Sequence, residues 1–201
     1  MTDTRPADAF RSALLALQQV FNDFARPAMI IGGMAAVARG VPRLTRDIDA
    51  TIEAEGLDVD GALALLRQHG FEPRIEHAAE FARQRLVLLL RLRPSGVDLD
   101  LSLAWLRFER EALTRATAFD FEGIMLPVAA VEDLIVLKAV AWRLGDRSDI
   151  ERLLIRHGRN VDLERIRSAL GQLLNMLEEP ERLAEFDRLV AAVDATYWQP
   201  N

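Results

Sequence analysis

Residues 29–52 read MIIGGMAAVARGVPRLTRDIDATI, and this stretch decides the fold. A short apolar run, 28–31, ends at the pair Gly32-Gly33, and thirteen residues then separate Gly33 from Asp47. The segment DIDATIE, 47–53, alternates with a period of two, which is typical of a strand. We therefore predict a strand at 28–31, a glycine turn, a short helix at 34–40 and a second strand at 47–53.

The composition is that of an ordinary globular protein without disulfides. The chain has 201 residues, 28% of them charged, no cysteine and a net charge of −6. An acidic chain disfavours tight non-specific DNA binding, and the missing thiols exclude cysteine nucleophiles and thiolate zinc sites. The first ten residues do not resemble a signal peptide, and no apolar run is long enough to cross a membrane. We expect a cytoplasmic protein.

Strand patterns occupy the first two thirds of the chain and helix patterns the last third. Helices are expected at 7–25, 58–70 and 104–116, and two strands flank Pro94-Ser95-Gly96 within 85–103. From 131 to 194 the pattern is helical, with breaks expected near Gly145, Gly158 and Pro180. This order predicts an α+β protein with a core at 1–128 and a helical lobe at 129–201 packed on it.

The two aspartates of the second strand indicate a metal site. Asp47 and Asp49 lie two residues apart, so their side chains share one face of the strand, opposite Ile48. Two like charges on one face repel each other unless a cation lies between them. Mg²⁺ fits because it prefers oxygen ligands and completes its shell with water and phosphate oxygens. The alternative is a pair of exposed carboxylates that cap local groups.

The glycine pair strengthens the case for a phosphate site. A strand, a Gly32-Gly33 turn and a helix let backbone N–H groups approach a phosphate closely. Glycine pairs alone are a weak signal, because tight turns use them for steric reasons. A two-metal arrangement also needs a third carboxylate. The segment GVDLDLSL, 96–103, offers both Asp98 and Asp100, and the spacing does not choose between them.

Taken together, these motifs resemble a known family. The pattern GG-x13-DID with a later strand aspartate is similar to the polymerase-β-type nucleotidyltransferase fold, a small mixed sheet flanked by helices. The segments RLTRDID, SGVDLDLSL, RFEREAL and LPVAAVEDLIVLKAVAWRLGDRSDI resemble AbiEii-type toxin nucleotidyltransferases, which are related to the minimal nucleotidyltransferases. The resemblance covers about residues 27–157.

The resemblance implies a magnesium-dependent enzyme that transfers a nucleotide from an NTP to an RNA (tRNA) or protein acceptor, with a possible antitoxin partner. By position, Asp47, Asp49 and Asp100 match the catalytic and metal-binding acids, and Gly32 and Gly33 match the glycine signature. The family position that corresponds to Asp98 is often not acidic, which favours Asp100 as the third acid.

Lys138 is the single lysine of the chain, beside 24 arginines. It lies on a helical stripe with Leu134, Ile135, Ala141 and Trp142, where an unpaired ammonium is costly. A compact mobile charge suits a triphosphate contact. The alternatives are a lysine that reaches the rim of the stripe, or chance in an arginine-rich composition.

The other nucleotide-binding candidates flank these motifs. Arg43 and Arg46 precede the aspartate strand, where guanidinium groups can bind phosphate or simply be solvated. Thr45, between them, also has a turn-shaping explanation. Arg143 and Asp149 match charged positions of the family after the lysine helix, whereas we interpret Asp146 as part of a structural arginine–aspartate lattice.

We therefore expect a nucleotidyltransferase, plausible as the toxin of a toxin–antitoxin pair. A first alternative is a small-molecule adenylyltransferase similar to the antibiotic-modifying members of the fold. A second is a non-catalytic protein that keeps the fold and binds a protein or RNA.

Overall fold

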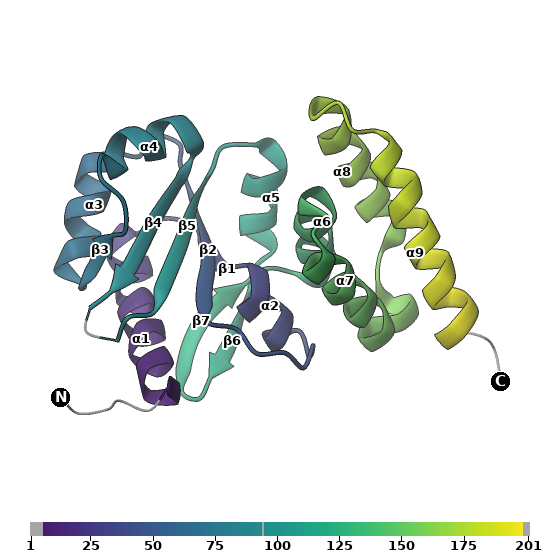
Figure 1. Ribbon diagram of the computed structural model, residues 1–201, viewed down its shortest axis with the longest axis horizontal. Coiled ribbons are helices and arrows are strands. Elements are labelled where there is room, and N and C mark those ends of the chain that lie inside the picture. Colours follow the sequence, from purple (N-terminus) through teal and green to yellow (C-terminus); the bar gives the residue numbers. More distant parts are fainter. Residues whose placement is uncertain (1–5, 94, 199–201) are drawn as a thin grey trace. The chain divides into compact units, whose positions relative to one another are not determined.

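The computed structural model describes residues 6–93 and 95–198 (Figure 1). These residues form two compact units, each built from two segments of the chain. Of the described residues, 6–34, 44–93 and 95–129 form unit 1, and 35–43 and 130–198 form unit 2. The sequence boundary between 128 and 129 stays a prediction. In the part of the chain that is described, no helix is both long and apolar enough to cross a membrane.

Unit 1 is built on a mixed seven-stranded sheet in the order β3-β4-β5-β2-β1-β7-β6. The strands are β1 (Ala28–Ile30), β2 (Asp47–Glu53), β3 (Phe71–Pro73), β4 (Val87–Leu92), β5 (Asp98–Ala104), β6 (Thr117–Phe121) and β7 (Ile124–Val128). β2 runs parallel to β5, and β1 runs parallel to β7, while the remaining neighbours are antiparallel. The predicted α+β class with a small mixed sheet is confirmed.

Four helices accompany the sheet of unit 1: α1 (Pro6–Phe24), α3 (Val59–Gln68), α4 (Ala78–Arg85) and α5 (Arg107–Arg115). α1, α3 and α4 pack on one another and on the strands, because each has an apolar face to bury. One face of the central strands is fully apolar: Ile48, Ile52, Leu99 and Leu101 are completely buried. The predicted parity of β2, with Ile48 opposite the two aspartates, is therefore confirmed.

Helix α2 (Gly32–Ala38) begins in unit 1 and continues into unit 2. Unit 2 further contains α6 (Val131–Ala141), α7 (Leu144–His157), the short 3-10 helix η1 (Gly158–Asn160), α8 (Leu163–Met176) and α9 (Glu181–Tyr197). α6 packs on α7 and α8, and α9 packs on α7 and α8. Their shared core is aliphatic, with the ring of Phe186 completely buried inside it.

The predicted break near Gly145 is confirmed, and it lies between α6 and α7. Gly145 itself is the second residue of α7. The chain turns instead at Trp142, whose φ of 52° is left-handed and ends α6. A residue in the left-handed conformation ends a helix. Here that residue is Trp142, although a tryptophan disfavours this conformation. The predicted breaks near Gly158 and Pro180 are confirmed.

Candidate active site

Four carboxylates form a two-by-two array on the open face of the unit 1 sheet. Because β2 and β5 are parallel and in register, Asp47 lies directly beside Asp98, and Asp49 lies directly beside Asp100. Directly opposed residues on neighbouring strands have Cβ atoms about 5 Å apart. The structure therefore brings together both aspartate pairs that the sequence singled out.

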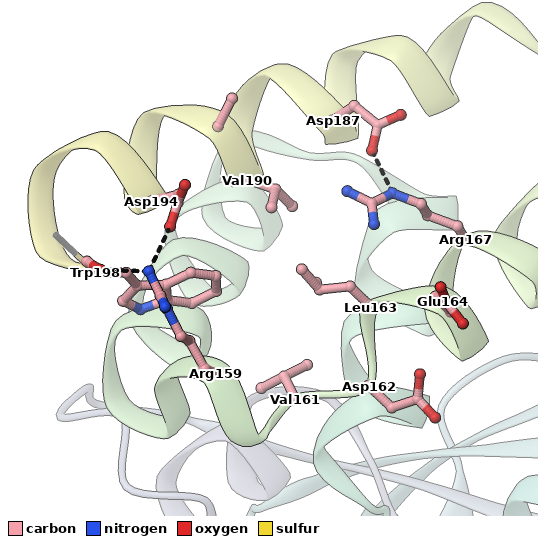
Figure 2. A pocket seen from close by; sticks show the side chains of 11 residues that line it. Arg159, Val161, Asp162, Leu163, Glu164, Arg167, Asp187, Val190, Asp194 and Trp198 are labelled. Atoms are coloured by element: carbon pink, nitrogen blue, oxygen red, sulfur yellow. Dashed lines mark hydrogen bonds and ion pairs between the residues drawn. The ribbon is translucent and has the colours of Figure 1, made fainter. Parts of the chain in front are cut away.

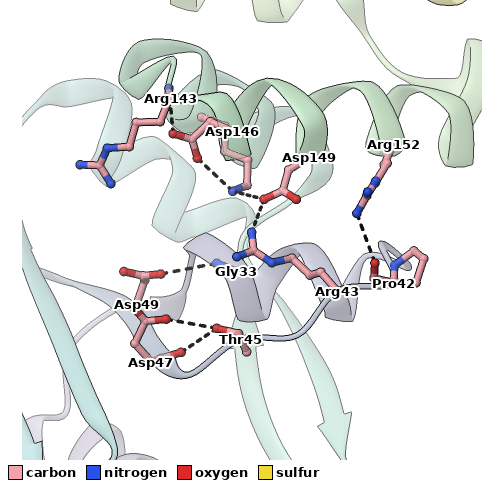
Figure 3. A network of polar contacts seen from close by, with 11 residues as sticks. Gly33, Pro42, Arg43, Thr45, Asp47, Asp49, Arg143, Asp146, Asp149 and Arg152 are labelled. Carbon is pink, nitrogen blue, oxygen red and sulfur yellow. Dashed lines mark hydrogen bonds and ion pairs between the residues drawn. The ribbon is translucent and has the colours of Figure 1, made fainter.

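Asp49 approaches the glycine turn so closely that Gly32 has no room for a side chain. A Cβ on Gly32 would lie 2.6 Å from the Cβ of Asp49 and closer still to its carboxylate, and the φ of Gly32 is +61°. The backbone N–H of Gly33 donates to Oδ2 of Asp49 at 3.4 Å (Figure 3). Glycine is thus required at position 32 by steric contact with Asp49 as well as by backbone conformation.

Asp47 is held at the start of β2 by the residue two positions before it. The hydroxyl of Thr45 donates to the backbone oxygen of Asp47 at 3.0 Å and lies 3.2 Å from Oδ1 of its carboxylate. Both contacts are visible in Figure 3. Thr45 therefore shapes this turn and orients Asp47. Arg46, the next residue, is exposed and makes no hydrogen bond or ion pair with the residues that the structure describes.

Arginines on the neighbouring strands neutralise the β5 carboxylates unequally. Arg91 of β4 lies directly opposite Asp98, and its Nε donates to Oδ1 of Asp98 at 2.6 Å. Arg74, just after β3, donates to Asp98 at 3.2 Å and also to Asp100. Only the register between β4 and β5 reveals this role of Arg91.

The two β5 carboxylates consequently differ in acidity. The hydrogen bond from Arg91 lowers the pKa of Asp98 below its ordinary value; burial opposes this effect, and the charges of Arg74 and Arg91 add to it. Burial raises the pKa of Asp100, and the charges of Asp47 and Asp98 raise it further, while Arg74 opposes them. A carboxylate with a raised pKa is the better proton acceptor of the two.

The four aspartates offer the oxygen donors that Mg²⁺ prefers. In this structure, however, their side chains contact other protein groups. Among the described residues, no three histidine, cysteine, aspartate or glutamate side chains are gathered tightly enough to hold a metal. Asp49 faces Gly33, Asp47 faces Thr45 and Asp100 faces Arg74. The carboxylate oxygens are of the chemical kind that fits a divalent cation.

The predicted lysine lies in unit 2, in a buried charge network between α6 and α7. The ammonium of Lys138 donates to Asp149 at 2.7 Å and to Asp146 at 3.3 Å. The Lys138 and Asp149 side chains are 5% and 4% exposed. Arg43 donates to the same oxygen of Asp149, as Figure 3 shows. Asp149 therefore binds both Lys138 and Arg43, which the sequence suggested as two separate nucleotide-binding candidates.

The remaining candidates of unit 2 lie at the start of α7 and in the loop after α2. Asp146 accepts the backbone N–H of Arg143 at 3.2 Å, so it caps α7 while contacting Lys138. The side chain of Arg143 is exposed. Arg152 of α7 donates to the backbone oxygen of Pro42 at 3.3 Å and ties the loop that carries Arg43 (Figure 3).

Unit 2 also contains a cavity of about 670 Å³ between α8 and α9 (Figure 2). Ion pairs span its walls, from Arg167 to Asp187 at 2.7 Å and from Arg159 to Asp194 at 3.8 Å. None of the residues predicted from the sequence lines it. The side chains suited to nucleotide chemistry are therefore found elsewhere.

Comparison with known proteins identifies the family. The model of the AbiEii family, described as a nucleotidyl transferase toxin of type IV toxin–antitoxin systems, matches residues 15–173. The chain therefore belongs to the AbiEii nucleotidyltransferase family and is a nucleotidyltransferase. A comparison with curated proteins finds no match.

Solved structures with the same fold include antibiotic-modifying enzymes. The antibiotic-resistance factor ANT(2'')-Ia is 18% identical with a TM-score of 0.58, and the match covers 89% of this chain and 99% of that one. An antigenic nucleotidyltransferase-like protein from Paracoccidioides brasiliensis is 20% identical over 88% of this chain and 93% of that one, with a TM-score of 0.52. The lincosamide adenylyltransferase LnuA is 16% identical over 70% and 93%, with a TM-score of 0.50. These likenesses show the nucleotidyltransferase fold.

Proposed function

We propose that this protein is a magnesium-dependent enzyme that transfers NMP from an NTP to a hydroxyl of an RNA (tRNA) or protein acceptor. The observation that supports this most strongly is the in-register pairing of Asp47 with Asp98 and of Asp49 with Asp100. Carboxylates gathered on one face repel one another, and a bound cation would relieve that repulsion.

In this proposal Asp47, Asp49 and Asp100 would hold Mg²⁺, and the ion would supply positive charge for the triphosphate and the acceptor oxygen. Asp100 lies near the acceptor hydroxyl and accepts its proton. The acceptor oxygen forms the new bond to the α-phosphorus, the bond between this phosphorus and the bridging oxygen breaks, and pyrophosphate leaves. Stabilisation of charge carries most of such a reaction.

The assignment of the other candidates belongs to the same proposal. Gly32 and Gly33 would contact the phosphates through their backbone, and Thr45 would orient Asp47. Lys138, Arg43, Arg46 and Arg143 are the cations assigned to the nucleotide, and Asp149 orients two of them. We further propose that the enzyme acts in the cytoplasm as the toxin of a toxin–antitoxin pair, with an antitoxin protein as its partner.

A second candidate function is adenylyl transfer to a small molecule. It is supported by the fold shared with ANT(2'')-Ia over 99% of that enzyme's length. The two functions differ in the acceptor of the nucleotide, so parallel incubations with different acceptors decide between them.

The experiment incubates the purified protein with Mg²⁺ and each α-labelled NTP, with tRNA, with its own protein and with aminoglycosides or lincosamides in separate arms. Asp49→Ala serves as the inactive variant, and Asp8→Ala, an exposed residue of α1, serves as the matched control. Label on RNA or protein that Asp49→Ala abolishes supports the first function. Label only on a drug supports the second, and no label in any arm contradicts both.

A further inference from the structure

Both carboxylate oxygens of Asp98, the first acid of β5, accept hydrogen bonds from arginines. Oδ1 of Asp98 accepts Nε of Arg91 at 2.6 Å, and Oδ2 accepts Nη2 of Arg91 at 3.1 Å and Nη1 of Arg74 at 3.2 Å. Charge-assisted bonds of this kind are strong and directional. Because both oxygens of Asp98 are occupied by two guanidinium groups, this carboxylate is poorly placed to bind a metal.

Asp100 is occupied on one oxygen only. Nη2 of Arg74 donates to Oδ1 of Asp100, whereas Oδ2 accepts no hydrogen bond from the residues that the structure describes. Arg74 thus bridges the two acids of β5, with one nitrogen on each. Its backbone N–H bonds the oxygen of Leu89 at 2.9 Å, which fixes the base of the side chain beside β4.

A guanidinium and a divalent cation compete for the same carboxylate. Both are attracted by the negative array, and each repels the other at short range. Arg74 lines a cavity of about 230 Å³ together with Glu72, Pro73, Arg91 and Arg93. This cavity gives the Arg74 side chain space to occupy when a metal ion displaces it from Asp100. The Arg74 side chain is 26% exposed.

We propose that Arg74 is the resident counter-ion of the acid array, which a metal ion displaces from Asp100, and that Asp98 anchors Arg74 instead of binding the metal. This inference rests on the proposed function, because it names the metal-binding acid and the residue that sets its affinity. Arg74 is a positioning residue: it acts through Asp100.

The test measures Mn²⁺ affinity of the whole protein without nucleotide, by electron paramagnetic resonance of the free ion. Arg74→Gln is expected to tighten Mn²⁺ binding about tenfold, because a competing positive charge is removed. Arg74→Lys keeps the charge and is expected to stay nearer the wild-type affinity. Arg83 of α4 forms an exposed pair with Asp60 of α3. Arg83→Gln is the matched control for loss of one positive charge and should change the affinity less than about twofold.

A double-variant comparison then separates the two roles of Asp98. If Asp98 anchors arginine, Asp98→Asn in the Arg74→Gln background changes Mn²⁺ affinity by less than about threefold. If Asp98 is a ligand, the same change weakens binding by more than about tenfold. Circular dichroism confirms that each variant is folded.

The results expected are tighter binding in Arg74→Gln and a small further effect of Asp98→Asn. Unchanged or weaker Mn²⁺ binding in Arg74→Gln overturns the inference, as does absence of Mn²⁺ binding in both the wild type and this variant. Failure of the proposed function would be seen separately, in the transfer assay, as the absence of any nucleotidyl transfer that depends on Asp49. Transfer that depends on Asp49, with Mn²⁺ affinity unaffected by Arg74→Gln, overturns only the inference.

Discussion

Asp149→Asn tests the buried charge network of unit 2. The Asp149 and Lys138 side chains are 4% and 5% exposed and lie 2.7 Å apart. The asparagine keeps the volume of the side chain and removes its charge. Lys138 is then left with Asp146, which is 3.3 Å away and 17% exposed, and Arg43 loses its contact with the same oxygen. A buried ammonium with a weaker partner destabilises the folded state.

The size of the effect follows from the burial. Removing one partner of a buried ion pair typically costs 3–5 kcal/mol, because the other charge stays desolvated. Since Asp146 still compensates part of the Lys138 charge, we expect the free energy of unfolding to fall by about 2–3 kcal/mol. The added change Lys138→Met removes the stranded charge and should recover more than half of this loss.

Urea denaturation followed by circular dichroism measures these differences. Asp194→Asn is the matched control, because it breaks an exposed pair with Arg159 at 3.8 Å in the same unit. This control should cost less than about 1 kcal/mol. A loss below about 1 kcal/mol in Asp149→Asn, or no recovery in the double variant, would refute the view that Asp149 compensates a buried lysine charge.

Two further predictions concern unit 1. Gly32→Ala forces a Cβ against Asp49 and strains a positive φ, so it should destabilise the protein by about 2 kcal/mol or more and reduce nucleotidyl transfer at least tenfold. Gly145→Ala, which meets no atom within 4 Å, is the control, and equal effects of the two changes on transfer would contradict the reasoning. Asp100→Asn should stabilise the metal-free protein at neutral pH, because the pKa of Asp100 is raised above 3.8, chiefly by burial. An acid with a raised folded-state pKa loses stability as the pH rises from 3.8 through that pKa, so the advantage of Asp100→Asn should vanish in denaturation curves measured below pH 3.8. An advantage that grows on acidification would show that the sign is wrong.

Local patterns were sufficient for the strands that carry the acids. The alternation in 47–53 and 96–103 predicted which side chains share a face, and the buried Ile48 and Leu99 confirm it. That Asp47 lies beside Asp98 could not be predicted, because the register of parallel strands depends on tertiary packing and not on local sequence. The short β3 and helix α4 were missed, since three residues of strand show no period.

Lys138 shows what could be predicted from the sequence and what could not. Its position among apolar neighbours predicted that Lys138 needs a partner, and the structure supplies Asp149 and Asp146 from the next helix. The partners could not be identified from spacing, because the turn at Trp142 decides how α7 follows α6. Arg74 carried no sequence signal at all, since its role depends on the order of β3, β4 and β5.

Nucleotidyl transfer by Asp49→Ala, compared with the wild type and with Asp8→Ala, tests the central claim most directly. The readout is label from an α-labelled NTP on any acceptor in the presence of Mg²⁺. Loss of an acid that holds the metal should lower the rate by about a hundredfold or more, and Asp8→Ala should leave it unchanged. Transfer at the wild-type rate in Asp49→Ala would contradict the assignment of this sheet face as the active site.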